Sequence, residues 1–241
     1  MLTDGGIKGL SALATLGSLV LPPMCLLCDR EARGNPSLCP DCLARARASA
    51  DQSLVEIGPG GVGTVLAAGP YEGVAGDLVR SLKFRRHLAA AAEAARLIER
   101  AIRHSLPALL ESRPTIVPVP PAPLRWLARG FDPAEEIAIA LAETLDLPYS
   151  RALRRRQGPR QTGRGRRERL LRPPSVELAE RLDLPEGSVL LVDDVFTTGA
   201  TLAACARPLL SGGAAGITGV NAVCVARAGL SRPKPQPALH S

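Results

Sequence analysis

Histidine and aromatic side chains are scarce in this sequence of 241 residues. The histidines are His87, His104 and His240, and no His-Glu-x-x-His motif is present. The sequence therefore excludes a metalloprotease of that type and leaves little room for a three-histidine zinc site. Aromatic residues make up 2% of the chain, too few for the stacking platform of a typical single-strand nucleic-acid binder.

Long apolar runs are also missing. The longest uncharged apolar stretch near the start, residues 9–24, is shorter than the about 20 residues of a spanning helix, and Pro22-Pro23 interrupts it. Lys8 alone precedes it as a positive residue, and no small-residue cleavage site follows, which argues against a cleaved signal peptide. We expect a cytoplasmic protein without a membrane span.

The chain does contain enough apolar residues for a core. Hydrophobic residues account for 46% and charged residues for 22%, and the mean hydropathy of +0.09 argues against a disordered chain. The length predicts one ordinary domain with a small appendage. The net charge of +7 comes from arginine, since Lys8, Lys83 and Lys234 are the only lysines; the charge alone says little about partners.

Strand-like apolar runs alternate with helical patterns from Val65 onward. In chain order these segments are residues 115–119, 133–145, 189–192, 200–210 and 219–226. Apolar runs of this length, connected by helices and bounded by Gly and Pro, are typical of buried strands in a parallel sheet. The predicted fold class is therefore α/β, with a parallel sheet flanked by helices.

Three regions are expected along the chain. Residues 1–57 contain an amphipathic opening helix (7–21) and a cysteine-rich segment, residues 62–227 form the sheet domain, and the proline-containing tail 228–241 is predicted to be disordered. The glycine-rich residues 58–63 match Gly-x-Gly-x-x-Gly, but strand-like sequence follows instead of a helix that could bind a pyrophosphate. We interpret them as a linker.

Two Cys-x-x-Cys pairs, separated by ten residues, lie near the N-terminus: Cys25 with Cys28, and Cys39 with Cys42. Such turns direct both sulfurs to one point, and two turns complete a tetrahedral zinc site with Zn–S distances of ~2.3 Å. Disulfides, a redox pair and metal-free thiols are the alternatives. A closed structural Zn²⁺ site is favoured, with a role in folding. The remaining two cysteines, Cys205 and Cys224, lie in apolar runs and are interpreted as buried core residues.

Two acids follow the apolar run 189–192. Asp193 and Asp194 are predicted at the carboxyl end of a strand, where open α/β sheets bind ligands. Unpaired charge is costly at the end of a buried strand, so both carboxylates are expected to accept hydrogen bonds from a ligand. A pair of vicinal hydroxyls fits two adjacent carboxylates.

A short turn then opens the next helix. Its residues are Thr197, Thr198, Gly199, Ala200 and Thr201. The unpaired N–H groups of a helix N-terminus, together with hydroxyls and a glycine, form a site for a phosphomonoester. The alternative is an ordinary helix cap by Thr197 or Thr198, which leaves the two acids unexplained. A phosphate next to a diol indicates a ribose 5-phosphate.

Residues 189–201 resemble the phosphoribosyl-diphosphate (PRPP) signature of type I phosphoribosyltransferases. With the two cysteine pairs and four further motifs, the chain resembles the ComF family of bacterial competence-related proteins over about residues 21–227. Those motifs are Tyr71-Glu72-Gly73, Leu82-Lys83-Phe84, Val117-Pro118-Val119-Pro120 and Arg129-Gly130-Phe131.

The resemblance implies a type I phosphoribosyltransferase-like sheet with an N-terminal zinc knuckle. Asp193 and Asp194 would be the catalytic acids that hold the ribose hydroxyls, partly through Mg²⁺, and residues 197–201 would bind the 5-phosphate. Arg125, Arg129 and Gly130 would face the pyrophosphate. In such enzymes a nitrogen nucleophile displaces pyrophosphate at C1, so the chain is a candidate glycosyltransferase with an unidentified acceptor.

The sequence departs from the family pattern after Phe131. The family usually has Asn-Gln where this chain has Asp132-Pro133. Asp132 can cap a helix that begins at Pro133, and Glu135 can complete a capping box. The exchange adds a negative charge near the expected pyrophosphate site. An Asn-x-x-Phe motif typical of the family is also missing near residues 172–176.

Residues 151–172 contain ten arginines and one acid, Glu168, interrupted by glycines and a proline. Such a run predicts a loop rather than a helix. It is either a solvated basic surface, or a loop that closes over the diphosphate as the resemblance implies, or a site for nucleic-acid backbone. The main hypothesis is a PRPP-binding protein; the alternative is a non-catalytic DNA-uptake adaptor that binds single-stranded DNA or competence proteins through this segment.

Overall fold

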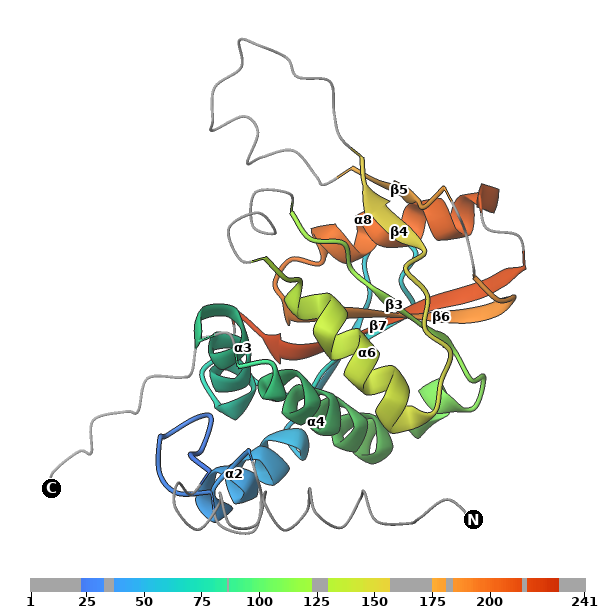
Figure 1. Cartoon of the computed structure of the whole chain (residues 1–241). Helices are drawn as coiled ribbons and strands as arrows, with labels where there is room; N and C mark the ends of the chain where they lie inside the picture. Colours follow the sequence, from blue (N-terminus) through green and yellow to red (C-terminus); the bar gives the residue numbers. More distant parts are fainter. Residues whose placement is uncertain are drawn as a thin grey trace, which may run out of the picture.

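The computed structural model describes residues 23–32, 37–85, 87–122, 130–156, 175–180, 184–213 and 216–229 (Figure 1). Several predictions concern residues outside these ranges. They are the opening helix 7–21, Arg125 and Arg129, residues 157–172 of the arginine-rich segment, and the tail from residue 230.

Five strands form one sheet in the order β1-β2-β7-β6-β3. The bounds are Leu54–Ile57 for β1, Thr64–Ala67 for β2, Thr115–Pro118 for β3, Gly187–Phe196 for β6 and Ile217–Arg227 for β7. Strands β2, β7, β6 and β3 are parallel to their neighbours, while β1 is antiparallel to β2. The four parallel strands carry their carboxyl ends to one edge of the sheet.

Helices cover both faces of the sheet (Figure 1). Helices α3 (Val74–Arg85), α4 (Ala89–Ser105) and α6 (Pro133–Leu145) pack on one face, and α2 (Pro40–Ala50) packs on α3 and α4. Helix α8 (Ala200–Pro208) lies on the opposite face. A 3-10 turn (Pro107–Leu110) follows α4 and a π turn (Leu209–Gly213) follows α8. Within the described ranges, no helix has both the length and the apolar character that a membrane crossing requires.

The alternation of side chains along β6 explains why both faces need a cover. Leu190 and Val192 belong to the hydrophobic cluster that contains α4 and α6, whereas Val189 and Leu191 belong to the cluster that contains α8. All four side chains are fully buried. A strand buried on both faces is typical of the centre of a parallel sheet, and the predicted α/β fold class is confirmed.

Residues 58–63, predicted to be a linker, form the tight turn that joins β1 to β2. The Gly58 N–H donates to the Gly63 carbonyl at 2.9 Å. Gly60 has a φ of +62°, and a Cβ added there would lie 2.5 Å from Cβ of Ala203 in α8. The segment is therefore a turn within one sheet, packed closely on α8. The division of the chain into domains stays a prediction.

A second, two-stranded sheet flanks the arginine-rich segment. Strand β4 (Leu153–Arg155) pairs in antiparallel fashion with β5 (Val176–Leu178). Strand β5 contacts α8, so this small sheet lies on the α8 face of the main sheet, and residues 153–155 of the arginine-rich segment form a strand where a loop is predicted.

Candidate functional site

A cavity of about 510 Å³ lies at the carboxyl ends of β3 and β6. Ligands of open α/β sheets bind at this edge. The cavity joins residues that are far apart in the sequence, from Tyr71, just before helix α3, to Ala228, just after β7. Its charged lining residues are Lys83, Asp132, Arg155, Asp193 and Asp194.

The two predicted acids lie in strand β6 itself. The strand was expected to end at Val192 but continues to Phe196, because it stays paired with β7 through Asp193, Val195 and Phe196. The Asp194 N–H donates to Asp193 Oδ1 at 2.8 Å. Both acids line the cavity, as they must if they are to reach a ligand there.

The environments of the two carboxylates differ. Lys83 Nζ lies 2.5 Å from Asp194 Oδ2, and both side chains are largely buried, with 13% and 15% of their surface exposed. Burial raises the pKa of Asp193 to about 8, and the negative charge of Asp194 adds to the shift. The two neighbouring acids therefore differ: Asp194 is paired with Lys83, whereas burial favours the protonated form of Asp193.

The threonine turn follows directly after β6. Gly199 is the N-cap residue of α8 with a φ of +73°, in the left-handed region that favours glycine. Thr197 and Thr201 line the cavity. Thr197 and Thr198 are exposed, and the Ala200 N–H lies at a long 3.5 Å from Thr198 Oγ1. The turn is thus open to a ligand at the N-terminus of a helix.

Neighbouring elements hold this turn in place. A Cβ on Gly199 would lie 2.4 Å from Pro59 Cγ, so the β1–β2 turn contacts it closely. Arg227 donates to the Thr197 carbonyl at 2.7 Å, pairs with Glu56 at 2.6 Å, and stacks over the Phe196 ring at 4.5 Å. The turn is therefore positioned from two strands, β1 and β7.

Helix α6 contributes the third acid of the cavity. Asp132 is the N-cap of α6, as predicted, and its Oδ1 accepts from the Ala134 N–H at 3.1 Å. Glu135 accepts a hydrogen bond from Tyr149 Oη at 2.9 Å and pairs with Arg151. Burial, with the charges of Glu135 and Asp194, raises the pKa of Asp132 to about 7. Asp132, which stands where the family usually has asparagine, therefore adds only part of a negative charge at neutral pH.

The pyrophosphate-facing residues expected from the resemblance are only partly described. Gly130 has a φ of +76° and directly precedes Phe131, which lines the cavity. Arg125 and Arg129 lie outside the described residues. The roles of all three stay predictions.

Sequence reasoning missed two cations of the cavity. Lys83 is largely buried beside Asp194. Arg155 lines the cavity from β4, and its Nε donates to the Pro120 carbonyl at 3.1 Å. The family motif Leu82-Lys83-Phe84 could have indicated a role for Lys83. Arg155 is one of many arginines in its segment, and nothing in the sequence distinguishes it.

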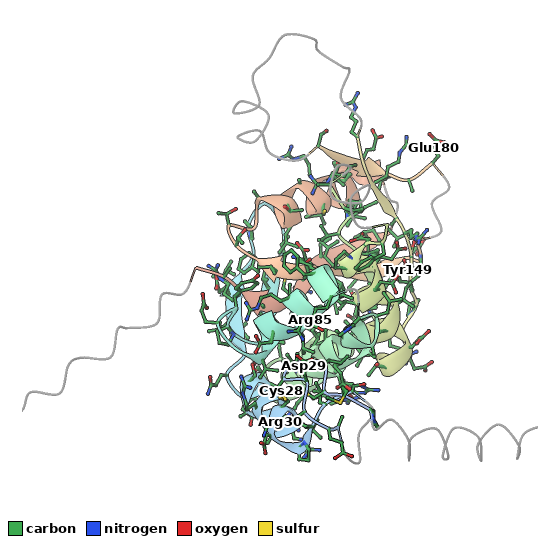
Figure 2. The ribbon with its side chains drawn as sticks, turned by 60° about the vertical axis from the view of Figure 1, so that its left-hand side comes forward. Cys28, Asp29, Arg30, Arg85, Tyr149 and Glu180 are labelled. Carbon is green, nitrogen blue, oxygen red and sulfur yellow. The ribbon has the colours of Figure 1, made fainter. Side chains whose placement is uncertain are left out.

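The four N-terminal cysteines come together at the opposite end of the molecule from β5. Figure 2 shows Cys28 and Arg30 at one end and Glu180, just after β5, at the other. All four sulfurs lie within 4.8 Å of one another, and Cys28 Sγ is 3.6 Å from Cys39 Sγ. Sulfurs at ~2.3 Å from a tetrahedral zinc would be about 3.8 Å apart. The cluster therefore fits structural zinc.

Local structure supports thiolate ligands in this cluster. Cys39 is the N-cap of α2, and Cys42 lies in its first turn, where the helix dipole stabilises negative charge. Arg30 Nε donates to Cys28 Sγ at 3.5 Å and lowers the pKa of the Cys28 thiol to about 6. Burial raises the pKa of Cys42, so a metal ion bound at this sulfur would have to displace its proton.

Cys205 and Cys224 are fully buried in the hydrophobic cluster on the α8 side. This confirms their interpretation as core residues. Burial raises the pKa of the Cys205 thiol to about 12, which makes it unreactive.

Comparison with known proteins extends these observations. The chain is 33% identical over 198 residues to the DNA utilization protein YhgH of Salmonella typhimurium, covering 80% of this chain and 86% of that protein. It is 30% identical over 200 residues to YhgH of Escherichia coli, covering 80% and 87%. It is 38% identical over 101 residues to the competence protein ComFC of Bacillus subtilis, covering 42% and 40%. No protein-family model matches the chain.

Proposed function

Because the chain belongs to the ComF/YhgH family of DNA utilization and competence proteins, we propose that it binds PRPP with Mg²⁺ in the β3–β6 cavity as part of DNA utilization. One observation carries the proposal: two adjacent carboxylates and an open threonine turn at a helix N-terminus line the same cavity. A ribose 5-phosphate presents the complementary groups, a diol and a phosphate, within one small molecule.

For each part of the ligand, the cavity contains a protein group of complementary chemistry. Asp194, paired with Lys83, accepts hydrogen bonds from the ribose hydroxyls, and Asp193 accepts them as well or donates its own proton to a hydroxyl oxygen. The backbone N–H groups of the turn and the hydroxyls of Thr197 and Thr201 donate to the 5-phosphate. The cavity volume of about 510 Å³ is within the range of small-molecule sites.

The diphosphate requires positive charge. Arg155 supplies it within the described lining, where Lys83 is already paired with Asp194, and Arg125 and Arg129 are proposed to add to it. Carboxylate oxygens are also the ligands that Mg²⁺ prefers, so the acids of the cavity fit this ion. When bound with the ligand, Mg²⁺ would neutralise charge on the diphosphate.

A site of this kind supports transfer of the phosphoribosyl group to a nitrogen acceptor. The bond from C1 to the diphosphate oxygen breaks, its electron pair leaves with pyrophosphate, and the acceptor nitrogen bonds to C1 and releases its proton to water or to the pyrophosphate. Arg155 stabilises the developing negative charge of the leaving group. A screen of purine, pyrimidine and pyridine bases that follows pyrophosphate release would identify the acceptor.

Titration calorimetry with PRPP and Mg²⁺ tests the proposal. We expect saturable binding by the wild-type protein and at least a tenfold weaker affinity for Asp194→Asn, since a hydrogen bond to a charged group contributes about 1.5–3 kcal/mol. Asp51→Asn, which changes a half-exposed acid at the end of α2, is the matched control and should bind as wild type. Equal affinities for wild type and Asp194→Asn, or no heat from either, would contradict the proposal.

A second candidate function is binding of single-stranded DNA through the arginine-rich segment. The names of the relatives refer to DNA utilization and competence, and the segment begins in strand β4, which pairs with β5. In strand β4, Arg154 pairs with Glu177 and Glu180, at 3.1 and 2.9 Å. The charge of Arg154 is thus partly neutralised. DNA would therefore contact the arginines between residues 160 and 172.

For this candidate, we expect replacement of the six arginines from position 160 to 172 by Gln to weaken binding of a labelled oligonucleotide at least tenfold, with a shallower salt dependence. Fluorescence anisotropy between 50 and 200 mM salt measures both. Arg154→Gln, which removes a paired arginine, is the control and should change little. Unchanged affinity in the six-residue variant would exclude the segment as the DNA site.

A further inference from the structure

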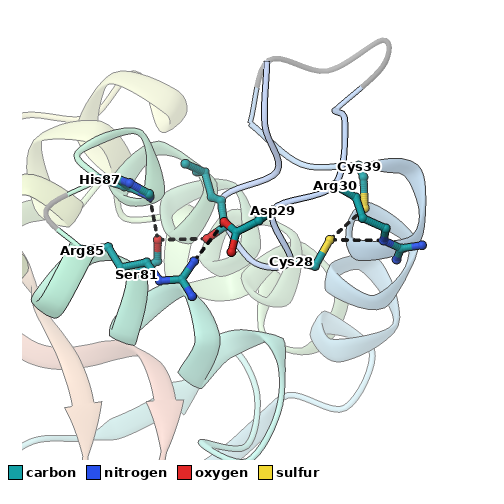
Figure 3. Close-up of polar contacts among 8 residues, drawn as sticks. Cys28, Asp29, Arg30, Cys39, Ser81, Arg85 and His87 are labelled. Carbon is teal, nitrogen blue, oxygen red and sulfur yellow. Dashed lines mark hydrogen bonds and ion pairs between the residues drawn. The ribbon is translucent and has the colours of Figure 1, made fainter. Parts of the chain in front are cut away.

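Helix α3 lies between the cysteine cluster and the ligand cavity. Ser81 and Arg85 are four residues apart and share one face of the helix, whereas Lys83 lies midway between them, on the opposite face. Figure 3 shows Ser81 and Arg85 directed toward the segment that carries Cys28 and Asp29. Lys83 lines the cavity on the other side. The same helix turn therefore contacts both regions.

Two polar contacts fasten the first cysteine turn to α3 (Figure 3). Ser81, which is 3% exposed, donates through Oγ to the carbonyl of Leu26 at 3.2 Å. Leu26 lies between the two cysteines of the first pair. Arg85 Nη1 lies 3.2 Å from Asp29 Oδ1, and the Asp29 N–H closes the turn by donating to the Cys25 carbonyl at 3.1 Å.

Apolar packing reinforces these contacts. Cys25, Cys39 and Cys42 belong to the same hydrophobic cluster as Leu78 and Leu82 of α3. All five side chains are at least 96% buried. Close-packed groups of this kind transmit small displacements instead of absorbing them.

On the cavity side, the Lys83–Asp194 pair responds strongly to any such displacement. The two charged atoms are 2.5 Å apart and largely withdrawn from water. Attraction between charges with little solvent around them is weakly screened, so a change in their separation changes the interaction energy more than it would in water. A shift of the last turns of α3 would therefore release Asp194 and alter its orientation toward a ligand.

We propose that Lys83 is a positioning residue through which the cysteine cluster sets the ligand affinity of the cavity. Ser81 is the link on the cluster side and Asp194 is the acid that Lys83 orients. The effect on affinity rests on the proposed function, whereas the coupling between Ser81 and Lys83 does not. The cluster then serves the ligand site directly, in addition to stabilising the fold.

Side-chain NMR of the zinc-loaded, full-length protein tests the coupling without any ligand. The chain has three lysines, so the ¹⁵N signals of the ammonium groups are few, and Lys83→Arg identifies that of Lys83. We expect Ser81→Ala to shift this signal at unchanged zinc content. Ser105→Ala, which removes a comparable partly buried bond to Ser53 (2.6 Å) at the end of α4, should leave it in place. A Lys83 signal that does not move in Ser81→Ala would overturn the coupling.

A double-mutant cycle with PRPP and Mg²⁺ tests the consequence for affinity. We expect Ser81→Ala to weaken binding about fivefold in the wild-type background, the effect of one hydrogen bond, and to have no effect in Lys83→Met. Equal losses in both backgrounds, or wild-type affinity in Lys83→Met, would overturn the role of Lys83. Failure of the wild-type protein to bind PRPP would refute the proposed function, and the lysine signal would still decide the coupling.

Discussion

Replacement of Cys42 by serine is expected to abolish zinc binding and to lower the free energy of unfolding by at least about 3 kcal/mol. Cys42 is fully buried, and its sulfur lies within 4.8 Å of the other three. Serine provides no thiolate to complete the tetrahedron. Its side chain would also leave a polar group in a cluster that includes Leu38 and Leu78.

Metal analysis and urea unfolding measure the two effects. The matched control is Cys205→Ala, which removes an equally buried thiol from the hydrophobic cluster on the other face of the sheet. This variant should keep one zinc per chain and lose only the packing of a small side chain. Full zinc content in Cys42→Ser, or the same loss of zinc in Cys205→Ala, would contradict a four-cysteine site.

Replacement of Asp132 by asparagine is expected to stabilise the protein in a pH-dependent manner. Burial raises the pKa of Asp132 to about 7 in the folded state, against about 3.9 for an unfolded chain. The folded protein therefore holds a proton that the unfolded chain releases, and its stability falls as pH rises from about 4 to about 7. Asparagine has no such proton and is an equally good N-cap.

The free energy of unfolding of Asp132→Asn should exceed that of wild type by an amount that grows from pH 4 to 7 and then stays constant. The expected plateau is on the order of 3 kcal/mol. Thermal or urea unfolding across this pH range measures it. Asp146→Asn, at the other end of α6 with a side chain that is 99% exposed, is the control and should show no such gap. A gap independent of pH would show that burial does not hold the proton on Asp132.

The Asp132 variant also restores the residue that the ComF family usually has after Arg-Gly-Phe. The aspartate of this chain brings a third acid to a cavity that already contains Asp193 and Asp194. Burial keeps the Asp132 carboxyl partly protonated. An aspartate in place of asparagine therefore adds less than one full negative charge to the cavity. This explains how the departure is compatible with an anionic ligand at the same edge of the sheet.

Much of the candidate site could be predicted from short stretches of sequence. The cysteine cluster follows from two Cys-x-x-Cys turns, and the family resemblance is confirmed by the relatives. The pair Asp193–Asp194 and the turn after it form one strand–turn–helix unit, so their geometry depends on a few consecutive residues. The α/β fold class followed from the alternation of apolar runs and helical patterns.

Other features could not be predicted in this way. Strand β6 continues past its apolar run because β7 pairs with it up to Phe196, and residues 58–63 are a packed turn because α8 lies against them. Lys83 and Arg155 reach the cavity from α3 and β4, more than 30 residues from Asp194 along the chain. Their positions depend on packing between elements, which no local pattern records.

The sequence alone was thus sufficient to identify functional groups that lie within a single turn. These are the thiols that could bind a metal, and the acids and hydroxyls at the end of a strand. Tertiary packing settled which charges face those groups and how far each is withdrawn from water. The physical reason is that turn geometry is a property of a few backbone dihedrals, whereas burial and charge pairing depend on all the elements that surround a side chain. The Lys83–Asp194 pair and the shifted pKa of Asp132 therefore emerged only once α3, α6 and β6 were assembled around one cavity.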